Sequence, residues 1–186
     1  MTSFTDAHPT YVAGIWVLDP MHSEVTFWVK HLAISKVRGS FERFTATIIT
    51  AEDPTKSTVE ASVEVASVDT NQKDRDNHLR TNDFFKADEF PNMTFVSTSV
   101  VRNGDDITVV GDLTLRGVTK SVTLAGEFGG IVVDGSSQSK AGFSASTKIN
   151  RHDFGVSWNA ALEAGGLTLG DDVTINLELQ FTLQTG

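Results

Sequence analysis

Cysteine is absent from this chain of 186 residues. Its absence excludes disulfide bridges, thiolate nucleophiles, iron–sulfur clusters and zinc sites built from cysteine. Long apolar runs are absent as well, because no stretch approaches the roughly 18 apolar residues of a membrane-spanning helix. We therefore expect no stable membrane insertion, and the sequence points to no cofactor.

The chain also lacks a recognisable secretory signal. Its first residues, MTSFTDAHPT, contain no basic stretch, no apolar stretch and no small-residue cleavage site. We therefore expect a cytoplasmic protein whose residues 1–12 form a flexible N-terminal tail. A length of 186 residues suits one domain with a sizeable core, and we place that single domain at residues 13–186.

Positive charge is scarce. The sequence has 15 Lys and Arg against 24 Asp and Glu, for a net charge of −9. An acidic surface repels phosphate backbones, so we expect no nucleic-acid partner. The same charge argues against electrostatic docking on anionic lipid headgroups. If the protein handles a lipid, the charge favours doing so inside a cavity.

What the sequence has in abundance is alternation of apolar and polar residues. Residues 23–31 place Val25, Phe27 and Val29 on one face of an extended strand, and residues 58–68 alternate in the same way. Residues 173–183 carry six apolar residues in strict alternation, which is typical of a strand with one buried face. Further strands are predicted at residues 92–101, 107–115, 121–128 and 141–149.

Turn residues separate these strands, as at Asn103-Gly104-Asp105, which predicts a hairpin. About eight short strands with such spacing predict an all-β barrel or sandwich. Residues 71–85 break the alternation, and we interpret residues 73–81 as a short helix with Asn71 as its N-cap. Asp76 and Arg80 are spaced for a surface ion pair, which is the reading we favour, and the alternative is an Arg of this segment that turns inward to meet a polar headgroup or to tie the helix to a strand.

Several motifs in order along the chain resemble the YceI family. The more specific ones read R-D-x-H-L-R-x-x-D-F-F at residues 75–85 and G-D-L-T-L-R-G-V-T-K at residues 111–120. They are accompanied by L-D-P-M-H-S at residues 18–23, V-R-G-S-F at residues 37–41, and I-N-R followed by D-F-G within residues 149–155. The resemblance covers most of the chain from Gly14 to Leu183.

This resemblance implies an extended antiparallel β-barrel of lipocalin-like type with a short helix at one end. It also implies an elongated hydrophobic pore that holds a polyisoprenoid chain, with isoprenoid quinones or fatty-acid derivatives as other occupants. Members of this bacterial family are commonly periplasmic, and the missing signal sets this chain apart from them. A transport, storage or sequestering role without catalysis is the function that the resemblance implies.

We expect the ligand-binding residues to be mainly apolar side chains that face the barrel interior. The candidates are Phe27, Val29, Phe41, Phe44, Val63, Val65, Leu79, Phe84, Phe85, Phe95, Leu113, Phe143, Phe154 and Trp158. His22 joins them as a hydrogen-bonding group at the cavity mouth, and the commoner alternative is a histidine that satisfies local backbone at a barrel end. A register error of one residue would exchange the inward and outward faces of any strand.

Two alternatives to a lipid carrier stay open. In the first, the chain is a small enzyme acting on a hydrophobic substrate, with His22, Arg151 and Asp153 as the suspected groups. The sequence offers no nucleophile motif and no histidine pair with metal-ligand spacing, so we predict no catalytic residue and no metal site. In the second, side chains fill the barrel and the domain serves interactions alone. A homodimer through an uncovered strand is compatible with all of these readings.

Overall fold

The computed structural model describes residues 10–163 and 165–186. The flexible tail expected at residues 1–12 falls largely on residues 1–9, which lie outside the described residues. Tyr11 is held, because its hydroxyl donates to the carbonyl oxygen of Ala51 at 2.5 Å. Among the described residues, no helix is long and apolar enough to cross a membrane.

Eleven strands form one antiparallel sheet. They are β1 (Gly14–Leu18), β2 (Glu24–His31), β3 (Ser35–Phe41), β4 (Phe44–Thr50), β5 (Thr58–Glu64), β6 (Val68–Asp69), β7 (Asn92–Asn103), β8 (Asp106–Leu115), β9 (Val118–Val133), β10 (Ser139–Asn150) and β11 (Leu169–Leu183). The described α-helix is α2 (Lys73–Leu79), and the short 3₁₀ turns are η1 (Pro20–His22), η2 (Pro54–Lys56), η3 (Val65–Ser67) and η4 (Arg151–Phe154).

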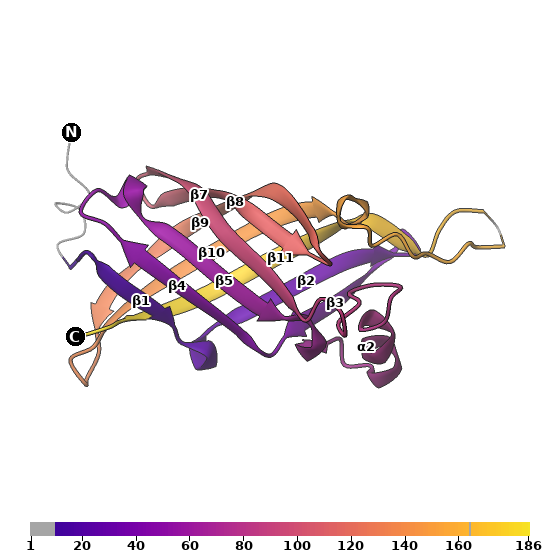
Figure 1. Cartoon of the computed structure of the whole chain (residues 1–186), viewed down its shortest axis with the longest axis horizontal. Coiled ribbons are helices and arrows are strands. Elements are labelled where there is room, and N and C mark those ends of the chain that lie inside the picture. The colour runs from indigo at the N-terminus through magenta and orange to yellow at the C-terminus, as the bar shows by residue number, and fades with distance from the viewer. Residues whose placement is uncertain (1–9, 164) are drawn as a thin grey trace.

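The sheet closes into an elongated barrel because β11 pairs with both β1 and β2 (Figure 1). These two strands follow each other along the chain and share one position in the wall, interrupted by η1. Strands β3 and β4 share a second position, and β5 and β6 a third, which leaves eight strand positions around the barrel. The predicted all-β antiparallel barrel of about eight strands with one short helix at an end is confirmed.

The predicted helix is shorter than expected and its cap is wrong. Its residues are Lys73–Leu79, and Gln72 occupies the N-cap position without a side-chain hydrogen bond. Asn71 instead adopts a left-handed backbone with φ of 60°, where its side chain does not cap the helix. The Asp76 carboxylate accepts from the backbone N–H and the hydroxyl of Thr70, at 2.9 and 2.6 Å.

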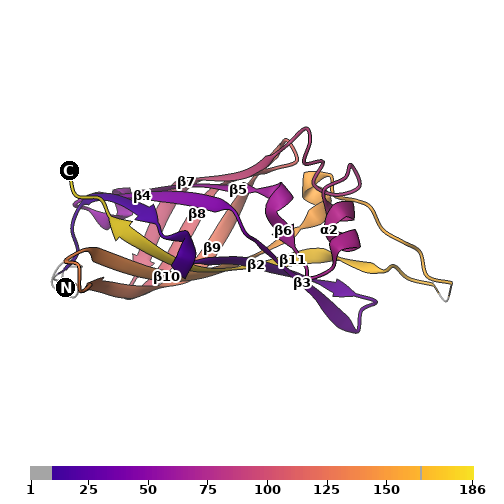
Figure 2. The same ribbon diagram turned by 90° about the horizontal axis from the view of Figure 1, so that it is seen from below.

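Arg80 ties the helix to the barrel, as the second reading of this segment predicted. Its guanidinium donates to the carbonyl oxygens of Ala66 and Val68, at 2.8 and 3.3 Å. The helix therefore lies against one end of the barrel, which we call the mouth end, beside η3 and β6 (Figure 2). The opposite end, where β1 begins and the C-terminus lies, is the terminal end (Figure 1).

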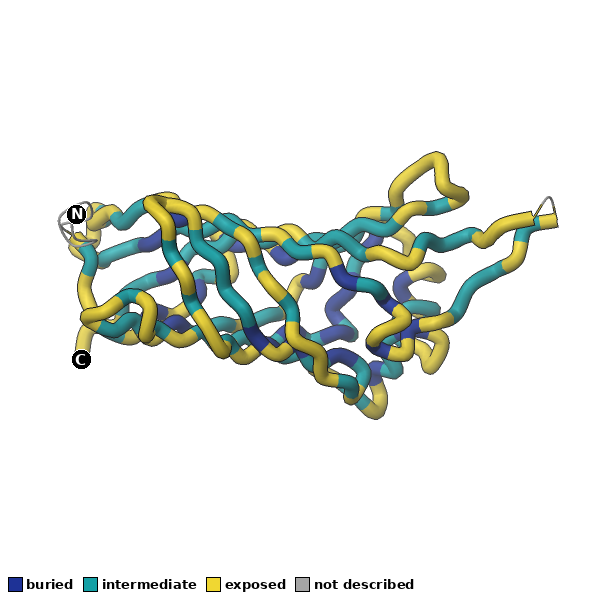
Figure 3. Tube along the Cα trace, turned by 90° about the horizontal axis from the view of Figure 1, so that it is seen from above, coloured by how far each residue is buried: buried dark blue, intermediate teal, exposed yellow. Residues whose placement is uncertain are grey.

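Two groups of buried apolar residues fill the barrel wall and part of its interior (Figure 3). The group at the mouth end includes Val65, Val68 and Phe154, each 2% exposed or less. The group at the terminal end includes Trp16 and Phe181. Inward residues of β11 such as Val173 and Ile175 are only half-buried, because they line space within the barrel rather than packed core.

Near the mouth end lies a seam, where residues 118–124 of β9 and residues 147–150 of β10 are not paired with each other. Residues 125–133 of β9 pair with residues 139–146 of β10, and η4 packs against β9 beyond that stretch. The guanidinium of Arg116 reinforces the seam, because it donates to the carbonyl oxygen of Asn82 at 2.7 Å and to that of Gly155. The loop after α2, the β8–β9 turn and η4 are thereby joined.

Candidate functional site

Two cavities lie inside the barrel. The larger, which we call the mouth cavity, has a volume of about 480 Å³ and lies beside α2. The smaller, the terminal cavity, has a volume of about 150 Å³. Strand β11 links them, because Val173 and Ile175 line the mouth cavity while Leu177 and Leu179 line the terminal cavity. One alternating face of a single strand therefore runs along both.

Strands β2 and β3 supply the aromatic wall of the mouth cavity. The ring of Phe27 lies 5.5 Å from that of Phe41, and Phe41 meets Phe85 edge-on at 5.8 Å. Gly39 leaves room for the Phe27 ring, because a Cβ atom at position 39 would lie only 2.5 Å from that ring. The strand pairing therefore needs glycine at this position to seat the Phe27 ring over β3.

The helix and the loop after it supply a second wall. The imidazole of His78 meets Trp158 edge-on at 4.7 Å and Phe84 at 5.0 Å, and its Nε2 lies 2.7 Å from the Asp83 carboxylate. These contacts join α2 to the segment after η4. Leu79, Phe84, Phe85 and Trp158, which the sequence placed in the lining, all face this cavity.

Arg151 is the most deeply buried charged group in the wall of the mouth cavity. It is 4% exposed, and its Nε and Nη1 donate to the carbonyl oxygens of Gly170, Val156 and Trp158 at 2.8 to 2.9 Å. Its Nη2 has no hydrogen-bond partner among the described residues. Burial lowers the pKa of the guanidinium, and Asp171 opposes this shift. Arginine nevertheless keeps its charge in proteins, so a cation borders an otherwise apolar space.

The mouth cavity reaches the surface at the first turn of α2. Asp74 and Arg75 line it and are exposed. The Arg75 guanidinium donates to the hydroxyl and the carbonyl oxygen of Thr70, at 2.7 and 2.8 Å. His31 and Thr168 complete a polar edge around the opening. The site therefore combines an apolar interior with polar groups at one end, as ligand pockets for amphipathic molecules do.

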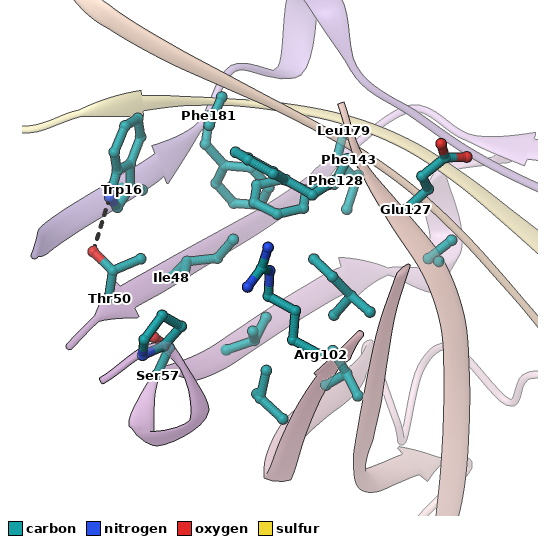
Figure 4. A pocket seen from close by; sticks show the side chains of 18 of the residues that line it. Trp16, Ile48, Thr50, Ser57, Arg102, Glu127, Phe128, Phe143, Leu179 and Phe181 are labelled. Carbon is teal, nitrogen blue, oxygen red and sulfur yellow. Dashed lines mark hydrogen bonds between the residues drawn. The ribbon is translucent and has the colours of Figure 1, made fainter. Parts of the chain in front are cut away.

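The terminal cavity is lined by aromatic side chains from several strands (Figure 4). Phe143 lies 5.3 Å from Phe128 and 5.8 Å from Phe181. The indole of Trp16 donates to the hydroxyl of Thr50 at 3.0 Å, which satisfies its N–H beside the cavity. Arg102 points into the same space from β7 (Figure 4).

The structure divides the predicted lining residues into five groups. Those in the wall of the mouth cavity are Phe27, Val29, Phe41, Leu79, Phe84, Phe85 and Trp158. Phe143 lines the terminal cavity, and Phe44 packs against both buried groups. Those buried in the surrounding core without lining either cavity are Val63, Val65, Phe95, Leu113 and Phe154. His22 lies elsewhere, on the outside of the barrel.

The expected place of His22 at the cavity mouth is wrong. His22 ends η1 between β1 and β2, its side chain is 64% exposed, and its Nδ1 lies 2.7 Å from the Asp19 carboxylate. His22 stabilises this local turn. The sequence predicts the turn at an end of the barrel, but η1 interrupts the wall midway along it. The other suspected catalytic groups do not join it, since Asp153 is exposed and Arg151 is buried in the mouth cavity wall.

Most of the terminal cavity was missed from the sequence. Its unpredicted lining includes Trp16, Ile48, Leu124, Leu177, Leu179 and Phe181. The signal was present in the strict alternation of residues 173–183, which places Leu177, Leu179 and Phe181 on the same face as Val173 and Ile175. Within the described part of the chain, no group of three or more His, Asp or Glu side chains is arranged to hold a metal ion.

Comparison with known proteins gives consistent matches. The family model described as YceI-like domain matches residues 16–181. UPF0312 protein SERP2314 of Staphylococcus epidermidis is 38% identical over 167 residues, which cover 89% of this chain and 95% of that protein. UPF0312 protein SAS2572 of Staphylococcus aureus is 38% identical over 173 residues, which cover 90% and 97%.

Solved structures match as well. A Campylobacter jejuni YCEI protein shares 32% identity with a TM-score of 0.72, covering 84% of this chain and 90% of that one. A polyisoprenoid binding domain from Saccharophagus degradans shares 16% identity with a TM-score of 0.66, covering 93% and 100%. The second likeness establishes the fold alone.

Proposed function

The chain belongs to the YceI family, and from this premise we propose that it binds a long-chain apolar lipid, of the polyisoprenoid or isoprenoid quinone class, inside its barrel. The observation that carries the proposal is the pair of apolar cavities that the inner face of β11 lines in succession. The neighbour from Saccharophagus degradans, described as polyisoprenoid binding, supports the ligand class. We further propose that the protein acts as a carrier, store or sequestering protein and catalyses no reaction.

Burial of the apolar chain supplies the binding free energy. Removing apolar surface from water contributes about 25 cal/mol per Å², before the cost of ordering a flexible chain. Each isoprene unit adds a similar area, so affinity should rise with chain length until both cavities are filled. A ligand that occupied the mouth cavity alone would instead show a plateau at short chain length.

The polar end of the ligand belongs at the mouth in this proposal. Arg151 presents a buried Nη2 without an acceptor among the described residues, in the wall of the mouth cavity. A carbonyl, hydroxyl or phosphate oxygen is the acceptor that such a donor lacks, and hydrogen bonds to charged groups are worth about 1.5–3 kcal/mol. The apolar tail would then extend past Ile175 toward Leu177 and Leu179.

Mass spectrometry of the organic extract tests the proposal. The protein is purified gently without detergent, and its extract is compared with that of a mock purification. A stoichiometric long-chain isoprenoid or related lipid is the expected result. If the extract is blank, stripped protein is titrated with isoprenoid alcohols of graded length, and the absence of saturable binding at every length contradicts the proposal. The cytoplasmic location and the homodimer stay predictions.

A further inference from the structure

The hairpin that joins β2 to β3 differs in charge from the rest of the chain. Residues 30–38 read K-H-L-A-I-S-K-V-R, with three Lys or Arg and no acidic residue, in a protein of net charge −9. Lys30, Lys36 and Arg38 are all exposed. The Lys36 ammonium lies 3.9 Å from the centre of the Trp28 ring, on the outer face of the hairpin. A local basic surface therefore stands on an acidic molecule.

The tip of this hairpin is apolar and exposed. Ile34 is 83% exposed and Leu32 is 37% exposed. Leu32 and Ala33 both adopt left-handed backbone conformations, with φ of 53° and 58°, where glycine or asparagine is normally favoured. Folding alone would favour polar turn residues at this place, so the apolar tip is an outlier in both exposure and conformation, of the kind that points to function.

A second projection stands beside the first. It is formed by residues 160–163 and 165–168, where Ala161 pairs with Leu167, and Leu167 is 55% exposed. The backbone N–H of Leu32 donates to the carbonyl oxygen of Thr168 at 2.8 Å, which ties the two projections together. Both extend beyond the barrel at the mouth end (Figures 1 and 2), and both are largely exposed (Figure 3).

The bases of these projections line the mouth cavity. His31 and Val37 contribute from the hairpin, and Thr168 and Leu169 contribute from the loop. The apolar tips therefore flank the region where the cavity opens. We use the name mouth rim for Leu32, Ile34 and Leu167 together with Lys30, Lys36 and Arg38.

We infer that the mouth rim is a docking edge for the surface of an anionic lipid bilayer. Leu32, Ile34 and Leu167 would enter the boundary between headgroups and acyl chains, and the three basic side chains would lie against lipid phosphates. The acidic remainder of the molecule is repelled by the same surface, so docking orients the cavity opening toward the membrane. The exposed carboxylates of Asp74 at the opening, Glu163 in the loop and Asp172 on β11 oppose the attraction.

This inference revises the expectation drawn from net charge, which argued against electrostatic docking. Net charge describes the whole molecule, whereas attraction to a surface within a Debye length depends on the side chains that face it. The inference rests on the proposed function for its purpose, because a carrier of apolar lipid must collect and release its cargo at a membrane. The docking itself requires no cargo, so it is measured on protein stripped of lipid.

Sedimentation with vesicles tests the docking edge. Full-length stripped protein is mixed with vesicles of phosphatidylglycerol and phosphatidylcholine, and with vesicles of phosphatidylcholine alone, at low and at physiological ionic strength. We expect partitioning onto the anionic vesicles that weakens with salt. Substitutions Lys30→Gln, Lys36→Gln and Arg38→Gln should lower the partition coefficient about fivefold each, given about 1 kcal/mol per basic residue near such a surface.

Two double variants distinguish binding through the mouth rim from nonspecific adsorption through any exposed apolar side chain. Leu32→Ser with Ile34→Ser should lower anionic partitioning at least tenfold. Val132→Ser with Val133→Ser removes two valines that are 64% and 59% exposed on the β9–β10 hairpin at the terminal end, and it should leave partitioning unchanged. Circular dichroism shows that each variant is folded. The substituted rim side chains do not line the cavity, so cargo affinity in the absence of vesicles should be retained.

Three outcomes overturn the inference. The first is equal partitioning onto anionic and neutral vesicles. The second is an equal loss in the rim variant and the β9–β10 control. The third is wild-type partitioning at background level together with rim-dependent self-association by analytical ultracentrifugation, which would make the rim a contact between copies. Loss of cargo binding with docking intact would instead count against the proposed function alone.

Discussion

The two ends of the barrel are built from the same alternating strands and yet differ in what fills and closes them. At the mouth end, α2, η4 and two projections surround a cavity of about 480 Å³. At the terminal end, aromatic side chains such as Trp16, Phe143 and Phe181 reduce the interior to about 150 Å³. The strands of the wall are thus similar at both ends. The irregular segments and the large side chains at each end make the two interiors different.

This comparison suggests a division of labour along the bore. The wide end has a buried cation and a polar edge, and we assign it the entry and the polar head of the ligand. In the proposed function, the narrow end would hold the end of the apolar chain and would limit how long a chain fits. Substitutions at matched positions of the two ends test whether they bind different parts of the ligand.

The largest effects are expected from truncating the most buried ring at each end. Phe154 and Phe181 are each 1% exposed, and Phe154→Ala or Phe181→Ala should lower the free energy of unfolding by about 3–5 kcal/mol. Both variants should show a single transition in urea, monitored by tryptophan fluorescence and by circular dichroism. Two separate transitions in either variant would mean that the two ends fold independently, against one continuous barrel.

Filling each cavity tests which part of the chain it holds. Val173→Trp fills the mouth cavity and should weaken binding of isoprenoid alcohols of every length at least tenfold, since displacing two methylene groups costs about 1.6 kcal/mol at about 0.8 each. Ala145→Phe fills the terminal cavity and should weaken binding of long chains only. Fluorescence titration with a length series makes the measurement. An equal effect of the two variants at all lengths would contradict the division of labour.

The arginines that line the two cavities, Arg151 and Arg102, provide the next contrast. Arg151→Met removes the donor at the mouth and should weaken binding of an isoprenoid quinone by about 10- to 150-fold, which corresponds to the roughly 1.5–3 kcal/mol of a hydrogen bond to a charged group. A hydrocarbon of equal length should bind this variant and the wild type alike. Arg102→Met is the matched change in the terminal cavity.

The result for Arg102→Met fixes the direction of the ligand. If this variant loses quinone affinity while Arg151→Met keeps it, the polar head lies at the terminal end and the proposed orientation is wrong. Because Arg151 holds three backbone carbonyls, its variant is also checked by thermal unfolding. A uniform loss of binding for quinone and hydrocarbon would show a structural role rather than head recognition.

The wall could be predicted from the sequence to a greater extent than the ends. Period-two alternation placed Phe27 and Val29 on the inner face, because strand geometry dictates it locally. Val65 and Phe154 were expected in the lining and lie in the packed core instead. Whether an inward side chain meets a cavity or another side chain depends on partners far along the chain. A local sequence pattern cannot show which of these distant residues will pack there.

The structure of the two ends also depends on contacts between residues that are far apart in the sequence. Arg116 closes the seam through carbonyl oxygens of Asn82 and Gly155, and a backbone acceptor leaves no mark in the sequence. His22 was misplaced for a related reason, since the turn at η1 interrupts a wall position without ending it. The basic residues at positions 30–38 are visible in the sequence, but the negative net charge of the chain drew attention away from them. Their proposed role became apparent only when the fold placed this hairpin beside the cavity opening.

The smallest effect is expected at the terminal end, in the turn between β9 and β10. The Asp134 carboxylate accepts from the hydroxyl and backbone N–H of Ser136 and from the backbone N–H of Gln138, at 2.7 to 3.0 Å. The hydroxyl of Ser136 and then the N–H of Gln138 are the main causes that hold the pKa of this carboxyl below its usual range. Stabilisation is therefore complete above the unfolded pKa of about 3.9, and it is lost as pH falls through the lower folded pKa.

Asp134→Asn should accordingly lower the melting temperature slightly at pH 7, and the difference from wild type should vanish toward pH 2. Differential scanning calorimetry across pH 2–7 makes the comparison. Because the turn is exposed, solvent screens the interaction and the change stays small. Binding at the mouth cavity should be unaffected, since the turn lies at the opposite end of the barrel. A difference that grew on acidification would have the wrong sign for a carboxylate with a lowered pKa, and a loss of ligand affinity would show that the two ends are coupled.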